Sequence, residues 1–197
     1  MLKYIGFDYI DNSLLKVSPF EDLIEEVNTC RKCDLHKSRT NAVFGKGPVG
    51  ADIMIIGEAP GRDEDIKGIP FVGRAGRKLD DMFSAAGIKK SDVFITNVVK
   101  CRPPGNRNPE PIEMKKCRPY LLKQIEIIQP KVIVLLGNIA LSLVTGEPSG
   151  ITKMRGKSLE YLSYRAIPTF HPAYVLRNAG SEKTVVEDFK KAGRSIC

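Results

Sequence analysis

The sequence predicts an α/β domain built around a mostly parallel sheet, and two observations carry this prediction. Three short apolar runs, at 51–57, 92–99 and 131–137, have the composition of strands that are buried on both faces. A segment with helix-forming residues stands between or after these runs. Alternating strands and helices are typical of a parallel sheet with right-handed crossover connections.

The elements before and between these strands follow in chain order. Ser18 and Pro19 begin a helix that runs to about Cys30, because a capping residue followed by Pro is a helix start signal. A long loop follows the first strand. Apolar residues at helical spacing then predict a helix from Arg74 that stops at Gly87.

The second half of the chain continues the alternation. Residues 110–129 predict a helix that Pro119 should bend or split. A short helix follows the third strand at 138–146. A weaker strand pair is expected around 159–164 and 166–170, and a closing helix at 185–193. We expect a single domain over residues 1–197, with an N-terminal helical segment of about 1–30.

The composition and charge of the chain indicate its type of partner and its location in the cell. The chain has 197 residues and a formal net charge of +8, which favours a polyanionic partner such as nucleic acid. No run of about 18 apolar residues occurs, and the first residues lack the order of a secretion signal. We therefore expect a cytoplasmic protein that does not bind membranes.

Four of the five cysteines form two pairs, Cys30 with Cys33 and Cys101 with Cys117. In a reducing compartment such cysteines are more often metal ligands or packing residues than disulfide partners. Four thiolates suit either zinc or an iron-sulfur cluster, and two unrelated buried pairs are the alternative. The fifteen residues inside the second pair favour a cluster over a zinc site built from compact pairs.

The remaining cysteine and one histidine are set apart from these pairs. His36 follows the first pair at a spacing that zinc would accept, but we interpret it as a solvated residue beside the cysteines. Cys197, at the end of the chain, is expected to be a free thiol.

Polar segments follow several of the predicted strands. They read GEAPGRDED after the first strand, TNVVKCRP after the second and TFHPAYVLRN after the last. Parallel sheets bind ligands at the carboxyl ends of their strands. These segments are therefore the predicted location of the site.

The motifs GEAPGRDED, GIPFVGRAG, TNVVKCRPPGNRNP and HPAYVLR, together with the four paired cysteines, resemble the family 4 uracil-DNA glycosylases of thermophilic archaea and bacteria. The resemblance runs from about Cys30 to the closing helix. It implies a three-layer αβα fold with a central, mostly parallel four-stranded sheet. It also implies that the protein hydrolyses the bond between uracil and deoxyribose in base excision repair. A structural 4Fe-4S cluster held by Cys30, Cys33, Cys101 and Cys117 is part of the same resemblance.

Three residues at strand ends suit this chemistry. Asn97 can accept from uracil N3–H and donate to O4 with one amide, whereas cytosine presents the reverse pattern. Phe71 is suited to stack on a flipped base, and His171 to donate to uracil O2 as charge grows on the departing base. A capping Asn, a core Phe and a structural His are the plain alternatives.

The first motif supplies further candidates. Glu58 is placed to orient water or to face the sugar. Ala59 stands where the common uracil glycosylases have a carboxylate, so their general base has no counterpart here. Gly57 and Gly61 allow close approach of the base. The resemblance places Glu64 against the methyl group of thymine, and an acidic surface turn is its plain alternative.

DNA binding requires residues outside the base pocket. Leu176 is the predicted wedge that replaces the extruded base. Arg102, Arg107, Arg155 and Arg177 are the predicted phosphate contacts. Uracil-containing DNA is the expected partner of a monomer, and a sliding clamp is a candidate partner. The rival interpretations are an iron-sulfur DNA-binding module without hydrolytic activity and a glycosylase of broader specificity that accepts hypoxanthine.

Overall fold

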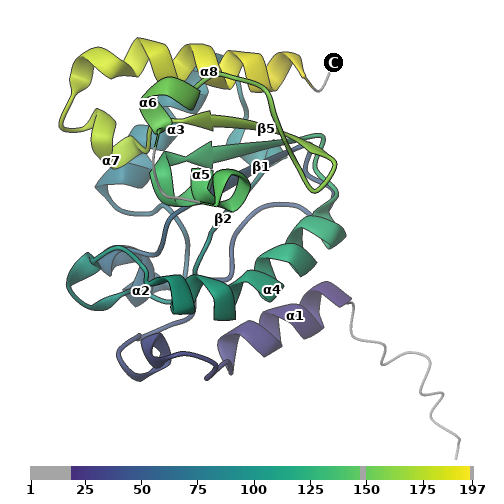
Figure 1. The fold of residues 1–197 in the computed structure, drawn as a ribbon, viewed down its shortest axis with the longest axis vertical. Helices are drawn as coiled ribbons and strands as arrows, with labels where there is room; N and C mark the ends of the chain where they lie inside the picture. The colour runs from purple at the N-terminus through teal and green to yellow at the C-terminus, as the bar shows by residue number, and fades with distance from the viewer. Residues whose placement is uncertain (1–18, 147–149, 196–197) are drawn as a thin grey trace, which may run out of the picture.

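The computed structural model describes residues 19–146 and 150–195, in which a five-stranded sheet lies between two layers of helices (Figure 1). The predicted capping residue Ser18 and the predicted free thiol Cys197 lie outside the described residues. The described part of the chain contains no helix long and apolar enough to cross a membrane.

The sheet has the strand order β2-β1-β3-β5-β4. Its strands are β1 (Ile53–Gly57), β2 (Val93–Asn97), β3 (Val132–Leu136), β4 (Leu159–Tyr161) and β5 (Tyr164–Thr169). The first three pairs are parallel, and only β4 runs antiparallel to its neighbour β5. The α/β prediction is therefore confirmed, with five strands in place of four. The count of four came from the resemblance, whereas the weaker strand pair predicted around 159–164 and 166–170 supplies β4 and β5. Leu162 and Ser163, both with positive φ, form the tight turn between them.

The helices are α1 (Pro19–Asn28), α2 (Arg62–Lys67), α3 (Arg74–Ala86), α4 (Pro111–Ile128), α5 (Gly137–Thr145), α6 (Ile151–Met154), α7 (Pro172–Val175) and α8 (Glu182–Arg194). Helix α3 ends where predicted, with Gly87 in the left-handed conformation at its end. Helix α4 is one continuous element through Pro119, so the predicted split does not occur. The short helices α2, α6 and α7 lie in segments that the sequence reading left without helices.

Alternate residues of the strands face opposite helical layers. Along β1, Met54 and Ile56 belong to the core that α1 and α4 cover, whereas Ile53 and Ile55 belong to the core under α3 and α8. Figure 1 shows these two layers on either side of the sheet. Both faces of the strands are thus apolar, as the continuous hydrophobic runs predict.

The register of the parallel strands brings their carboxyl ends to one edge. Gly57 at the end of β1 pairs with Asn97 at the end of β2, and Leu136 pairs with Thr169 across β3 and β5. The chain segments that follow these residues carry Glu58, Lys100 and His171. The polar motifs therefore meet at one end of the sheet.

Candidate active site

A cavity of about 540 Å³ opens at the carboxyl ends of the strands. Eight of the residues predicted from the sequence line it, namely Glu58, Ala59, Gly61, Glu64, Phe71, Asn97, His171 and Arg177. The sheet register explains this convergence, because these residues come from the segments that follow β1, β2 and β5 and from the loop before α3.

The Asn97 side chain contributes an unpaired acceptor to this cavity. Asn97 is 1% exposed, and its Oδ1 has no hydrogen-bond partner among the described residues. A buried amide oxygen without a partner carries a substantial desolvation cost. A ligand that donates a hydrogen bond to this oxygen would remove that cost.

Gly57 lies beneath the same amide. A Cβ at this position would stand 2.7 Å from Phe71 Cζ and still closer to Asn97 Oδ1. The φ angle of Gly57 is not in the left-handed region, so space, and not backbone conformation, requires glycine here. Gly57 thus lets the Asn97 amide and the Phe71 ring come together at the end of β1.

The loop that carries Phe71 is tied to α2. Phe71 has φ 51°, an unusual conformation for a large side chain. The Glu64 carboxylate accepts hydrogen bonds from the N–H groups of Val72 (3.0 Å) and Gly73 (2.8 Å). Glu64 was expected to stand against a thymine methyl group. It lines the cavity, and its Oε1 atom holds the loop that presents Phe71.

Phe71 is both a core residue and a cavity residue. It is 6% exposed and packs in the core under α3, while its ring lies 5.8 Å from the His171 ring, centroid to centroid, at an interplanar angle of 37°. Phe71 therefore packs in the core and also lines the cavity.

His171 precedes α7 and is held in one tautomer. Its Nδ1 accepts a hydrogen bond from the Ala173 N–H at 3.1 Å, so the neutral ring carries its proton on Nε2. Burial, assisted by the positive charge of Arg177, lowers the pKa of His171 to about 4. His171 is therefore a neutral hydrogen-bond donor near pH 7.

Glu58 is a second cavity residue whose pKa is shifted. Its carboxyl group is partly buried, and desolvation raises its pKa above the usual value. Ala59 beside it supplies no ionisable group. Among the described residues that line the cavity, Glu58 and Glu64 are the carboxylates, and only Glu64 is engaged in hydrogen bonds.

The four paired cysteines line one small pocket between α1 and α4, and none of them forms a disulfide. N–H groups point at three of the sulfurs. Arg39 Nη1 lies 3.0 Å from Cys101 Sγ, and the backbone N–H groups of Lys100 and Lys32 lie 3.3 Å and 3.5 Å from Cys117 Sγ and Cys30 Sγ.

Burial raises the pKa of the Cys33 and Cys101 thiols, and that of Cys117 to about 11. Over residues 19–146 and 150–195, no three His, Cys, Asp or Glu side chains are arranged to hold a metal ion. His36 is absent from the cysteine pocket, and its Nδ1 lies 2.8 Å from the Cys33 carbonyl oxygen.

Lys100 connects the cysteine pocket with the cavity, and the sequence reading missed it. Its side chain is 1% exposed, and Nζ donates to Thr96 Oγ1, the Asn97 carbonyl and Gln124 Oε1 at 2.6–2.7 Å. Burial lowers its pKa to about 7, an effect that the neighbouring Cys117 and Cys101 oppose. A lysine between a strand end and a cysteine was the only available signal.

The five residues predicted to bind DNA do not form one continuous group: one lies at the cavity, and others are bonded to neighbouring side chains. Leu176 is 42% exposed at the end of α7, and Arg177 lies at the cavity. Arg102 Nε donates to Asn106 Oδ1, and Arg107 forms two hydrogen bonds with the buried carboxylate of Glu113.

Arg155 does not lie at the cavity. Its guanidinium group forms an ion pair with the fully buried Asp188 of α8, and Asp188 also accepts from Thr169 Oγ1 at 2.7 Å. This ion pair gives Arg155 a structural role that does not involve DNA.

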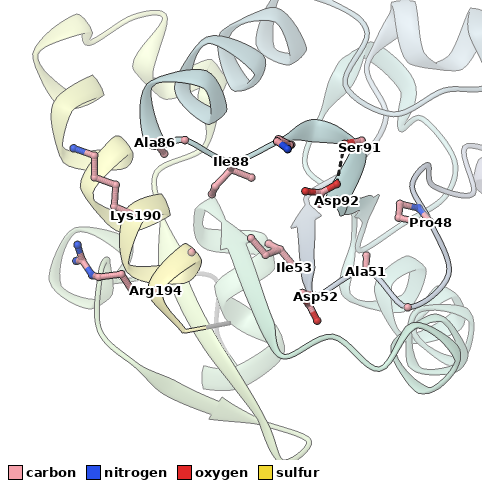
Figure 2. Close-up of a pocket in the computed structure, with 14 residues that line it drawn as sticks. Pro48, Ala51, Asp52, Ile53, Ala86, Ile88, Ser91, Asp92, Lys190 and Arg194 are labelled. Atoms are coloured by element: carbon pink, nitrogen blue, oxygen red, sulfur yellow. Dashed lines mark hydrogen bonds between the residues drawn. The ribbon is translucent and has the colours of Figure 1, made fainter. Parts of the chain in front are cut away.

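A larger hollow of about 870 Å³ lies at the opposite end of the strands, around Asp52 and Arg194 (Figure 2). None of the residues predicted from the sequence lines that hollow.

Five residues that were not predicted from the sequence also line the cavity, two of them the alanines Ala75 and Ala173. Asn106 and Asn108 come from the loop that follows Cys101, and Tyr174 comes from α7. Tyr174 is 40% exposed and stacks on Phe170, with the ring centroids 4.8 Å apart. Their motifs were recognised, but nothing local in the sequence distinguishes them from other loop residues.

Comparison with known proteins gives a consistent result. The sequence model of the Uracil DNA glycosylase superfamily matches residues 44–192. The chain is 46% identical to a Type-4 uracil-DNA glycosylase from Archaeoglobus fulgidus over 181 residues, which cover 88% of this chain and 91% of the relative. It is 50% identical to the enzyme of that name from Thermotoga maritima, over 87% of this chain and 92% of the relative. With the one from Sulfurisphaera tokodaii the identity is 51%, over 87% and 82%.

Proposed function

Since the chain belongs to the uracil DNA glycosylase superfamily and to its type-4 branch, we propose that it removes uracil from DNA by hydrolysis of the N-glycosidic bond. The products are free uracil and an abasic site, which is the first step of base excision repair. The observation that carries this proposal is the buried and unpaired Asn97 Oδ1 in the cavity at the sheet edge.

Asn97 is the residue that we propose to select the base. Its Oδ1 accepts from uracil N3–H, and its Nδ2 donates to uracil O4. Cytosine has an acceptor at N3 and an amino group at C4, so both contacts would be lost. A buried site whose polar groups are left unpaired by the wrong ligand discriminates by roughly 10⁴-fold or more.

Entry of the base requires that the nucleotide leave the helical stack, at a cost of a few kcal/mol. Stacking on the Phe71 ring offsets about 1–3 kcal/mol of this cost. The exposed Leu176 is suited to fill the space that the base vacates, and Arg177 at the cavity is suited to bind a neighbouring phosphate.

In the chemical step the bond between C1′ and N1 breaks, and both electrons leave with the base. Negative charge then grows on uracil O2, where the His171 Nε2–H donates a hydrogen bond. A neutral donor is available because the pKa of His171 is lowered to about 4. Water adds its oxygen to C1′, and the proton that it releases passes through solvent to the uracil anion, so that neutral uracil is the product. Glu58 is the cavity carboxylate suited to orient that water or to stabilise the positively charged sugar.

We further propose that Cys30, Cys33, Cys101 and Cys117 hold a 4Fe-4S cluster. All four sulfurs line one pocket, and N–H groups directed at three of them suit thiolate ligands. Ligands of a cluster bind different irons, so they need not surround a single point as the ligands of one ion do. When bound, the group supplies a covalent link between the end of α1 and the loop after β2.

One experiment tests the proposed activity. The purified protein is incubated with oligonucleotides that contain a single uracil, hypoxanthine, thymine or cytosine, and the products are treated with alkali to break abasic sites. We expect strand breaks at uracil and none at thymine or cytosine. The absence of breaks at uracil would contradict the proposal and favour a DNA-binding module without hydrolytic activity. Breaks at hypoxanthine as well as uracil would favour the broader specificity.

A further inference from the structure

A second hollow lies beside the proposed base pocket, between α3 and the end of α7. Arg74, Arg77, Lys78, Asp81 and Leu176 line this groove. Helix α3 and the end of α7 line both the groove and the base pocket. Ala75 of α3 and Arg177 after α7 are their residues in the base pocket. The exposed Leu176 side chain thus belongs to the groove, while its neighbour Arg177 belongs to the cavity.

The groove carries two arginines without ionic partners. Arg74 and Arg77 are exposed and lie one turn apart on α3, where side chains at this spacing are neighbours. Neither side chain forms a hydrogen bond or an ion pair with any residue in the described ranges. Lys78, in contrast, is paired with Glu182 at 2.7 Å. Asp81, one turn beyond Arg77, is the carboxylate of the groove.

We propose that Arg74 and Arg77 bind backbone phosphates of the DNA strand that carries the uracil, on the side of Leu176 opposite to Arg177. This inference rests on the proposed function. When the Leu176 side chain enters the base stack, the DNA backbone must be held on both sides of the insertion. Arg177 can bind a phosphate on one of these sides only. Guanidinium groups suit this role because they bind phosphate oxygens through two parallel hydrogen bonds. Asp81 marks the end of the phosphate path, since it repels the backbone.

The salt dependence of DNA binding tests this assignment. Each phosphate contact that is lost reduces the slope of log affinity against log salt by about 0.9 on duplex DNA and about 0.7 on a single strand. We therefore expect the double variant Arg74→Gln with Arg77→Gln to lower the slope by about 1.4–1.8. Binding is measured by fluorescence anisotropy on uracil-containing DNA between about 50 and 200 mM salt. The KM for uracil release should rise more than kcat falls.

A matched control removes the same charge elsewhere. Lys89 and Arg194 line the hollow at the opposite end of the strands, where Arg194 is seen in Figure 2. The double variant Lys89→Gln with Arg194→Gln has the same net charge as the test variant, and we expect it to keep the wild-type slope. Asp81→Asn should increase affinity for DNA several-fold at low salt, because it removes the repulsion in the groove.

Two results would overturn the assignment. One is an unchanged slope in the Arg74 and Arg77 variant when its circular dichroism and melting temperature match the wild type. The other is an equal loss of slope in the control variant, which would show that only net charge matters. A wild-type protein that binds DNA but releases no uracil would instead contradict the proposed function and leave the binding comparison valid.

Discussion

The rings of Phe71 and His171 lie 5.8 Å apart between centroids, although the two residues come from opposite halves of the chain. Phe71 is presented by the loop that Glu64 holds, and His171 by the N-terminus of α7. Gly137, with φ 85°, passes close to His171, and a Cβ there would stand 3.2 Å from the His171 Cβ. The pair is therefore positioned by backbone that larger residues would displace.

The close packing at Gly57 predicts that Gly57→Ala impairs uracil release. The new methyl group would stand 2.7 Å from Phe71 Cζ and nearer still to Asn97 Oδ1, so one of these groups must move. A displacement of about 1 Å in a catalytic site can cost roughly 10²-fold in rate, and we expect a loss of this order in kcat/KM. Gly180→Ala is the control, because a Cβ there meets nothing within 4 Å. Wild-type activity in the Gly57 variant would contradict the proposed position of the base.

The role proposed for Asn97 predicts a defect confined to base recognition. Asn97→Asp replaces the amide donor by a carboxylate oxygen, which would repel uracil O4. We expect the rate of uracil release to fall by about 10²- to 10³-fold at saturating DNA. Asn28→Asp introduces the same charge at an exposed position at the end of α1 and should have no effect. Unchanged selectivity between uracil and cytosine in the Asn97 variant would remove Asn97 from the base pocket.

The lowered pKa of His171 predicts its protonation behaviour. We expect His171 to remain neutral, with its proton on Nε2, down to about pH 5, whereas an unperturbed histidine titrates near pH 6.5. Nitrogen-15 NMR of the imidazole rings can test this, since the chain has only two histidines. The other, His36, bonds through Nδ1 to a carbonyl and should show the opposite tautomer.

The same shift has a consequence for stability. The folded-state pKa of about 4 lies below the unfolded value, so the unfolded chain takes up the proton first as the pH falls. The contribution of neutral His171 to the free energy of unfolding is therefore complete above about pH 6.5 and is lost as the pH falls toward 4. Titration of His171 near pH 6.5 in the folded protein would contradict both expectations.

The ion pair between Arg155 and Asp188 predicts a role in stability and not in DNA binding. Asp188 is fully buried, so Arg155→Gln leaves a buried carboxylate without its cation. Loss of one partner of a buried pair costs about 3–5 kcal/mol in the free energy of unfolding, which denaturant titration measures. The salt slope of DNA binding should stay at the wild-type value. A variant with normal stability and a reduced slope would restore Arg155 to the DNA-binding set.

The proposed cluster predicts the metal content of the protein. Anaerobically purified protein should contain about four iron atoms and four sulfides per chain and absorb broadly in the visible range. Cys101→Ser should lose most of this iron and melt at a lower temperature, because the link between α1 and the loop after β2 is weakened. Cys197→Ser should keep the iron content of the wild type. Stoichiometric zinc in place of iron would contradict the cluster.

Much of this site was accessible from the sequence because it depends on local patterns. Apolar runs identified β1, β2 and β3, and parallel strands necessarily bring their carboxyl ends to one edge. The motifs at the ends of β1, β2 and β5 then supplied Glu58, Asn97 and His171. Helix α3 was predicted with its end at Gly87, since periodic apolar residues and a terminal glycine are both local signals.

The choice of partner for each polar side chain was decided only by the tertiary structure. Arg155, which the sequence predicts as a phosphate contact, forms an ion pair with Asp188, which lies 33 residues further along the chain. Lys100 can be buried because Gln124 Oε1, from α4, accepts a hydrogen bond from its Nζ. Residue spacing specifies the periodicity of a helix or strand, but a charge on its surface has many possible partners at comparable energy. Packing of the two helical layers on the sheet selects among them, and that selection is not encoded in any short segment.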